Sequence, residues 1–135
     1  MTETFVEARQ RLQVRSGMGP LTEGFLNMLR PYRGLRDEVF RDLAQAVEAV
    51  VPHLRDGPLD HEVVKALWGI DFFARYWGVA PDGMLRRNGP ISAEDVERLS
   101  TWTTAIGWAV AMALDVQDDA LCLSELRLLP ESGLR

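Results

Sequence analysis

Residues 63–77 carry the most informative pattern in the chain, because apolar side chains occupy almost every position around a helix wound from them. One side of that helix holds Val63, Leu67, Ile70, Ala74 and Trp77. Another side holds Val64, Trp68, Phe72 and Tyr76. The segment is too long for a strand and too short to cross a bilayer. We therefore expect a helix that is buried on both sides, either inside its own domain or against a second chain.

The cleanest amphipathic pattern lies in residues 33–51, where apolar and charged side chains fall on opposite faces of one helix. The apolar face comprises Leu35, Val39, Leu43, Ala46, Val47 and Val50. Pro52 should end or kink this helix, because proline lacks a backbone donor and crowds the preceding turn.

Helix start signals recur along the chain. Side chains suited to an N-cap stand at Thr4, Thr22, Asp60, Ser92 and Asp118. They predict helices over residues 5–15, 23–30, 61–77 and 93–115, and a short final helix after residue 118. Turn signals separate these helices at residues 55–59, 80–83 and 88–90. Residues 84–87, between the last two turns, are too few for an element of their own.

These elements predict an all-α, single-domain bundle of five to six helices over residues 1–135. The first helix has only a narrow apolar stripe, so we expect residues 1–20 to form a loose N-terminal helical arm. Pro130 and Gly133 mark residues 130–135 as a frayed tail.

The second half of the helix over residues 93–115 is also apolar on all sides. Over residues 105–114, Trp108, Ala111 and Met112 take the places that polar side chains occupy in the first half. Two such helices hold more apolar surface than a 15.2 kDa chain can easily cover. Self-association is therefore the leading expectation.

Composition narrows the classes of function. The hydrophobic fraction of 47% and the charged fraction of 26% are ordinary for a soluble globular protein. A net charge of −5 argues against a general nucleic-acid binder, which needs an excess of cations. The single cysteine, Cys122, and the lack of a secretory signal or membrane span favour a cytoplasmic protein. The preference for arginine over lysine is typical of GC-rich bacterial genomes.

Two sets of polar residues are candidates for binding chemistry. Asp71 and Arg75 interrupt the apolar helix four residues apart, where they can form an ion pair or anchor a ligand. A basic cluster that could bind an anion comprises Arg30, Arg33 and Arg36. Metal-ligand residue types gather at Asp56, Asp60, His61 and Glu62. Their spacing matches no zinc pattern, and no catalytic motif is evident, so we expect no metal and no cofactor.

The leading hypothesis is a cytoplasmic, bacterial protein that acts through protein–protein contact, as a homodimer or a subunit of a larger assembly, rather than as an enzyme. Its expected interface anchors are Trp68, Phe72, Tyr76, Trp108 and Met112. One alternative is a small-molecule sensor or enzyme with an aromatic pocket around Asp71 and Arg75. Another is an accessory protein that contacts nucleic acid through Arg30, Arg33 and Arg36.

Overall fold

The computed structural model describes residues 4–18 and 24–135, and these form an all-α bundle without β-strands. The four longest helices are α1 (Phe5–Ser16), α2 (Asp37–Arg55), α3 (His61–Ala74) and α5 (Ala93–Leu114). Single-turn helices follow as α4 (Met84–Arg87), α6 (Asp119–Cys122) and α7 (Ser124–Arg127). The remaining elements are the 3₁₀ turns η1 (Phe25–Met28) and η3 (Pro130–Ser132) and the π-helical turn η2 (Arg75–Val79). The all-α, single-domain bundle predicted from the sequence is confirmed.

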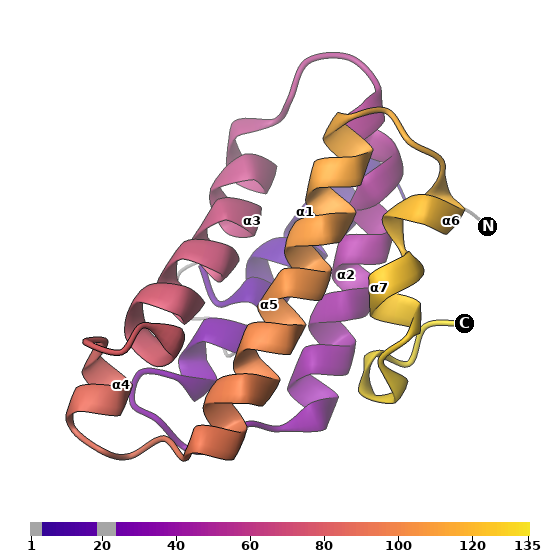
Figure 1. Cartoon of the computed structure of the whole chain (residues 1–135). Helices are drawn as coiled ribbons and strands as arrows, with labels where there is room; N and C mark the ends of the chain where they lie inside the picture. Colours follow the sequence, from indigo (N-terminus) through magenta and orange to yellow (C-terminus); the bar gives the residue numbers. More distant parts are fainter. Residues whose placement is uncertain (1–3, 19–23) are drawn as a thin grey trace.

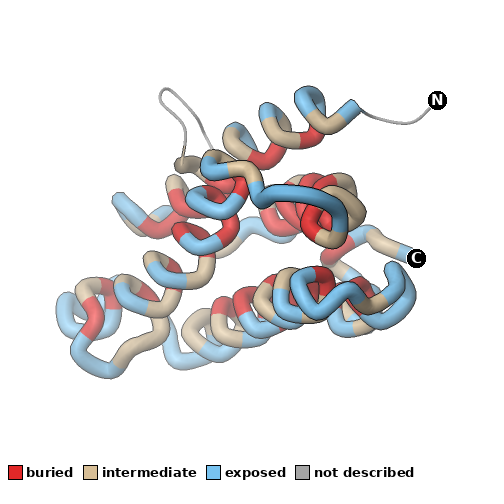
Figure 2. The backbone as a smooth tube through the Cα atoms, turned by 90° about the horizontal axis from the view of Figure 1, so that it is seen from above, coloured by how far each residue is buried: buried red, intermediate tan, exposed pale blue. Residues whose placement is uncertain are grey.

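The four long helices enclose one hydrophobic core. In Figure 1, α5 lies at the front, with α3 on one side of it and the short α6 and α7 on the other. α2 packs against both α1 and α5, and α3 packs against α1 and α5. Figure 2 shows buried residues along the inward sides of the helices and exposed residues on their outward sides. The outward sides of α3 and α5 are therefore neighbours on one face of the molecule.

α2 follows the predicted amphipathic pattern but runs further than expected. Its buried side chains include Phe40, Leu43, Val47, Val50 and Leu54. The helix begins at Asp37 rather than at residue 33 and continues through Pro52 to Arg55, so Pro52 does not end it, while the alternative of a kink stays a prediction. Pro52 stands in the last turn, where it removes one backbone hydrogen bond while the buried Val51 and Leu54 hold that turn against the core.

α1 is packed on the bundle, which corrects the expectation of a loose N-terminal arm. Ala8 and Leu12 are fully buried where the helix contacts α2 and α3. The Arg9 guanidinium also pairs with Asp60, at 2.9 Å, and so links α1 to the start of α3. A narrow apolar stripe is sufficient because the small Ala8 side chain lets the helices approach closely.

Two short elements differ from the predicted ones. Residues 84–87 do form an element, the single turn α4. Of the helix predicted over residues 23–30, the described residues 24–30 hold only the 3₁₀ turn η1. The predicted cap Thr22 lies outside the described residues.

The C-terminal segment is docked rather than frayed, which corrects the second expectation about the chain ends. The indole N–H of Trp102, in the core, donates to Glu131 Oε1 at 2.9 Å. Ser132 is fully buried, and η3 packs against α2. Gly133 has a φ of +70°, and a Cβ there would lie 2.8 Å from the Arg41 side chain. The tail therefore supplies the hydrogen-bond partner that a buried tryptophan requires.

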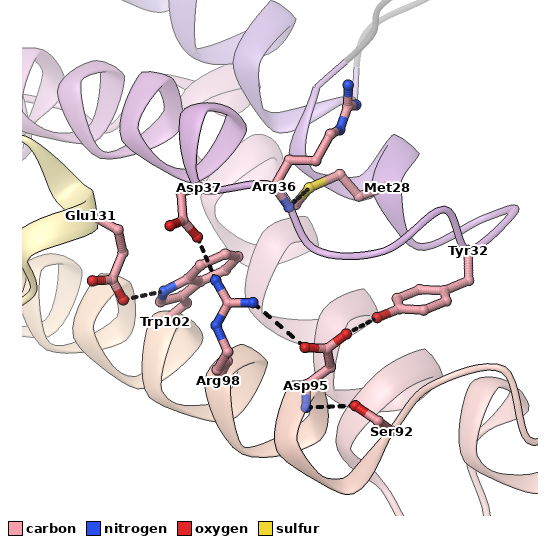
Figure 3. Close-up of polar contacts among 9 residues, drawn as sticks. All are labelled: Met28, Tyr32, Arg36, Asp37, Ser92, Asp95, Arg98, Trp102 and Glu131. Atoms are coloured by element: carbon pink, nitrogen blue, oxygen red, sulfur yellow. Dashed lines mark hydrogen bonds and ion pairs between the residues drawn. The ribbon is translucent and has the colours of Figure 1, made fainter.

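A network of polar contacts fixes the segment before α2 to the start of α5 (Figure 3). Tyr32 Oη donates to Asp95 Oδ2 at 2.5 Å, while Arg98 pairs with both Asp95 and Asp37. Ser92 Oγ caps α5 by accepting the Asp95 N–H at 3.1 Å. Burial and the hydrogen bond to Asp95 raise the pKa of Tyr32. Tyr32 therefore stays a neutral donor, and the network is structural.

Candidate functional site on the outward side of α3 and α5

The inward side of α3 holds the helix in place. Asp60 accepts the Val63 N–H at 3.1 Å as the N-cap and pairs with Arg9. Burial acts to raise the pKa of Asp60, but the hydrogen bonds from Val63 and Arg9 together bring it below its ordinary value. The buried side of the helix consists of Val63, Ala66, Leu67, Ile70 and Ala74. These contacts leave the opposite side of α3 without a role in the core.

That opposite side forms an apolar ridge, which we call the α3 ridge. Its members are exposed by 40%, 67%, 44% and 62% for Val64, Trp68, Phe72 and Tyr76, respectively. The spacing of four residues places them in one row along the helix. The rings of Phe72 and Tyr76 stack with centroids 5.6 Å apart. The sequence predicted that this helix is buried on both sides. Within the single chain only its inward side is buried, and the ridge is exposed.

The turn η2 follows α3 and carries Trp77, whose side chain packs against the core. Trp77 is half-buried and stacks on Phe73, with ring centroids 4.8 Å apart. The Arg30 guanidinium lies over its ring at 5.4 Å. Gly78 permits this turn, because a Cβ there would lie 2.5 Å from Leu99 Cδ2.

A groove of about 320 Å³ runs beside the ridge, between α3 and α5, and we call it the α3–α5 groove. Trp68, the most exposed residue of the ridge, also lines the groove. Asp71 is the one charged residue in the groove lining. Its apolar walls include Leu59, Val64, Leu67, Val110, Ala111 and Leu114. Leu114, the last residue of the apolar half-helix over residues 105–114 that was expected to supply part of the contact, is 48% exposed, and Leu59, which was not expected at the site, is 49% exposed.

The predicted pair of Asp71 and Arg75 is present as an ion pair at the groove. Arg75 Nε donates to Asp71 Oδ1 at 3.0 Å, and a second guanidinium nitrogen donates to Thr104 Oγ1, on α5, at 3.3 Å. Both charged side chains are partly exposed to solvent. The pair therefore joins α3 to α5, and its strength is that of a partly solvated ion pair.

Trp108 and Met112 do not join the ridge, although both were expected among the interface anchors. The Trp108 indole N–H donates to the Leu121 carbonyl at 2.9 Å, so its ring is held toward α6. Met112 is half-buried against the core. The five expected anchors thus divide into three on the α3 ridge and two on the flank of α5 away from α3.

The basic cluster occupies the exposed segment between η1 and α2. Arg30, Arg33 and Arg36 are all exposed, and no ion pair between described residues involves any of them. Arg36 donates its backbone N–H to Met28 Sδ at 3.3 Å, while its guanidinium points away from the polar network in Figure 3. The three guanidinium groups share this solvent-exposed segment, and the anion site expected there stays a prediction.

The remaining candidates are the metal-ligand residue types, Cys122 and the tryptophans. Within residues 4–18 and 24–135, no three His, Cys, Asp or Glu side chains are placed to hold a metal ion. Cys122 is fully buried, and burial raises the pKa of its thiol. The four tryptophans do not wall one pocket, since Trp102 lies in the core and Trp77 at the end of α3. The exposed apolar side chains that gather in one row, Val64, Trp68, Phe72 and Tyr76 on α3, therefore form the candidate site.

No protein-family model matches this chain, and neither the curated proteins nor the solved structures contain a match to it. In the described part of the chain, no helix combines the length and hydrophobicity that crossing a membrane requires.

Proposed function

We propose that this protein acts through protein–protein contact, with the α3 ridge and the α3–α5 groove as its contact surface. It works as a homodimer or as a subunit of a larger assembly in the cytoplasm of a bacterium. A lone buried cysteine suits a reducing compartment. The observation that carries the proposal is the 67% exposure of Trp68 at the crest of an apolar ridge.

The size of the ridge supports a contact role. Its four side chains expose on the order of 400 Å² of surface, since a whole aromatic side chain offers about 150–250 Å². A patch of that size is among the largest on typical monomers and is often functional. At about 25 cal/mol per Å², covering it contributes roughly 10 kcal/mol, which is comparable to the cost of association.

Sedimentation velocity over a wide concentration range tests the proposal. We compare the unmodified chain with Trp68→Gln, which removes the ridge crest but keeps a helix-forming residue of similar length. The matched control is Leu128→Gln, because Leu128 is 73% exposed and follows α7, on the other side of α5 from α3 (Figure 1). We expect the unmodified chain and the control to exceed 15.2 kDa at high concentration, and Trp68→Gln to stay at that mass.

A subunit of a larger assembly gives a different result. The purified chain then stays at 15.2 kDa, but tagged chain retains a defined protein from its native cells. That retention should disappear with Trp68→Gln and persist with Leu128→Gln. A chain that is monomeric alone and shows no contact dependent on Trp68 contradicts the proposal.

The groove favours a second candidate function, the binding of a small apolar molecule with one polar group. Its volume of about 320 Å³ lies at the lower end for ligand pockets, and Asp71 is the charged residue in its lining. Binding would change the fluorescence of Trp68, which lines the groove. Titration with apolar amines should therefore give a saturable change in the unmodified chain that weakens in Asp71→Asn, while a linear response excludes a site.

A further inference from the structure

The α3–α5 groove lies beside the first half of the α3 ridge, because Val64 and Trp68 line it whereas Phe72 and Tyr76 do not. Trp68 belongs to both, as the crest of the ridge and the edge of the groove. A surface with a ridge beside a groove is complementary to a second copy of itself. A twofold axis along the helices, between the two features, sets each ridge opposite the partner's groove. Each chain therefore supplies a ridge and a groove, and both are used in a symmetric contact between two copies.

Gly107 keeps the floor of the groove open in the middle of α5. A Cβ at this position would meet only Asp71 Oδ1, at 3.8 Å, which is an ordinary contact. Gly69 on α3 is different, because a Cβ there would lie 2.5 Å from Met18 Sδ. Glycine inside a helix lowers stability relative to alanine, so each such residue calls for a reason. Packing within the chain supplies the reason for Gly69 but not for Gly107.

The charges beside the two features also match across such an axis. Lys65 follows Val64, and Asp115 follows Leu114, and the two apolar residues line the same end of the groove. Lys65 and Asp115 are both exposed. They therefore flank the contact surface at the same level, Lys65 on the α3 side and Asp115 on the α5 side. The twofold arrangement brings Lys65 of one copy opposite Asp115 of the other.

We infer that the occupant of the α3–α5 groove is Trp68 of a second copy, in a twofold dimer that covers both ridges and places the Trp68 end of each ridge in the partner's groove. This inference rests on the proposed function and names the partner at the same site. With the groove walls and flanks included, the contact buries on the order of 1,200 Å² in total, the lower limit for specific stable interfaces. Gly107 provides the space beneath the incoming indole.

Complementation between two variants tests this arrangement. Trp68→Gln removes the ridge crest and leaves the groove open, whereas Ala111→Arg puts a long charged side chain into the groove and leaves the ridge intact. Each variant alone should dimerise at least about 30-fold more weakly than the unmodified chain, the lower bound for a hot-spot side chain. An equimolar mixture should form a heterodimer, because the ridge of the second variant fits the open groove of the first.

Circular dichroism checks that each variant is folded. If the Ala111→Arg chain does not fold, Leu114→Arg replaces it, because Leu114 also lines the groove and is 48% exposed. Unimpaired dimers of both groove variants, or no heterodimer in the mixture, overturn the ridge-in-groove arrangement. The proposed function survives those results if Trp68→Gln still abolishes association. A monomeric chain with a Trp68-dependent foreign partner overturns this inference alone.

Lys65 and Asp115 provide a second, independent test, because these two charges come together only if the partner is a second copy of the chain. Lys65→Glu should weaken dimerisation about two- to fivefold, and Asp115→Lys in the same chain should restore it, since both changes meet across the axis. A double variant that is weaker than Lys65→Glu alone contradicts the twofold placement. High salt should reduce the difference between these variants.

Discussion

The protein carries two aromatic clusters of similar composition, one in the core and one on the surface. In the core, Phe40 and Trp102 stack with ring centroids 4.4 Å apart and are fully buried. On the α3 ridge, Phe72 and Tyr76 stack at 5.6 Å beside Trp68, and all three are exposed. The two tryptophans are 0% and 67% exposed. Residue type alone therefore does not decide which cluster becomes the core.

The polar environment of each tryptophan distinguishes the clusters. The indole N–H of Trp102 donates to Glu131, and its ring also lies under the Arg98 guanidinium at 4.9 Å. These contacts satisfy the donor and enclose the ring with groups of the same chain. Trp68 has a groove beside it instead, so the contacts that would enclose it have to come from another molecule.

The largest expected effect is on the core cluster. Trp102→Ala should lower the free energy of unfolding by about 3–5 kcal/mol, because it leaves a large cavity and an unpaired Glu131 at the docked tail. Urea unfolding followed by circular dichroism measures the change. A loss similar to that of an exposed aromatic would contradict the central place of Trp102 in the core.

The same measurement on the ridge sharpens the comparison. Trp68→Gln should cost about 1 kcal/mol or less at low concentration, since the exposed part of the ring makes no contact that folding provides. The effect should grow as the concentration of the chain rises, because association stabilises only the folded form of the unmodified chain. A stability loss close to that of Trp102→Ala, at any dilution, would mean that the ridge is part of the core.

Local signals in the sequence were enough to predict the four long helices, although not all of their bounds. Thr4, Ser92 and Asp118 each accept a backbone N–H three residues later, as their cap patterns predicted. The amphipathic pattern likewise predicted the inward side of α2. These features involve neighbours along the chain, so the chain itself contains the information needed to find them.

The exposed surface was predicted only in part: Trp68, Phe72 and Tyr76, three of the five expected anchors, are exposed on α3, whereas Trp108 and Met112 lie elsewhere. Both sides of residues 63–77 are apolar, so their pattern does not indicate which side packs on α1 and α5. Trp108 was grouped with Trp68 by type, but its hydrogen bond to Leu121 holds it on the other flank of α5. The docking of the tail depends on Glu131 meeting Trp102, 29 residues earlier. Each of these facts requires the tertiary arrangement.

The third prediction concerns Asp60 at the start of α3. If the cap and the inward side hold this helix in place, a change at Asp60 should lower stability even though it leaves the ridge intact. Asp60→Asn should lower stability by up to about 1 kcal/mol at neutral pH, since it removes the charge that pairs with Arg9 but keeps a side chain that can cap the helix. The folded pKa of Asp60 is lowered, so its contribution is present above the carboxyl's unfolded value and is lost as pH falls through the folded value. The unmodified chain should therefore lose more stability on acidification than Asp60→Asn does. Equal pH profiles would contradict the role of Asp60.

The smallest expected effect concerns Gly107, in the floor of the groove, where the inference places Trp68 of the second copy. Gly107→Ala should raise the stability of the monomer by about 0.5–1 kcal/mol, because a Cβ there meets only Asp71 Oδ1 at 3.8 Å. Gly83→Ala provides the contrast, since its Cβ would lie 2.7 Å from the Tyr76 carbonyl oxygen and should destabilise the chain. Thermal unfolding of dilute samples compares the two variants with the unmodified chain. If Gly107→Ala instead destabilises the monomer, the floor of the groove is already filled by the chain itself, and no partner is needed to occupy it.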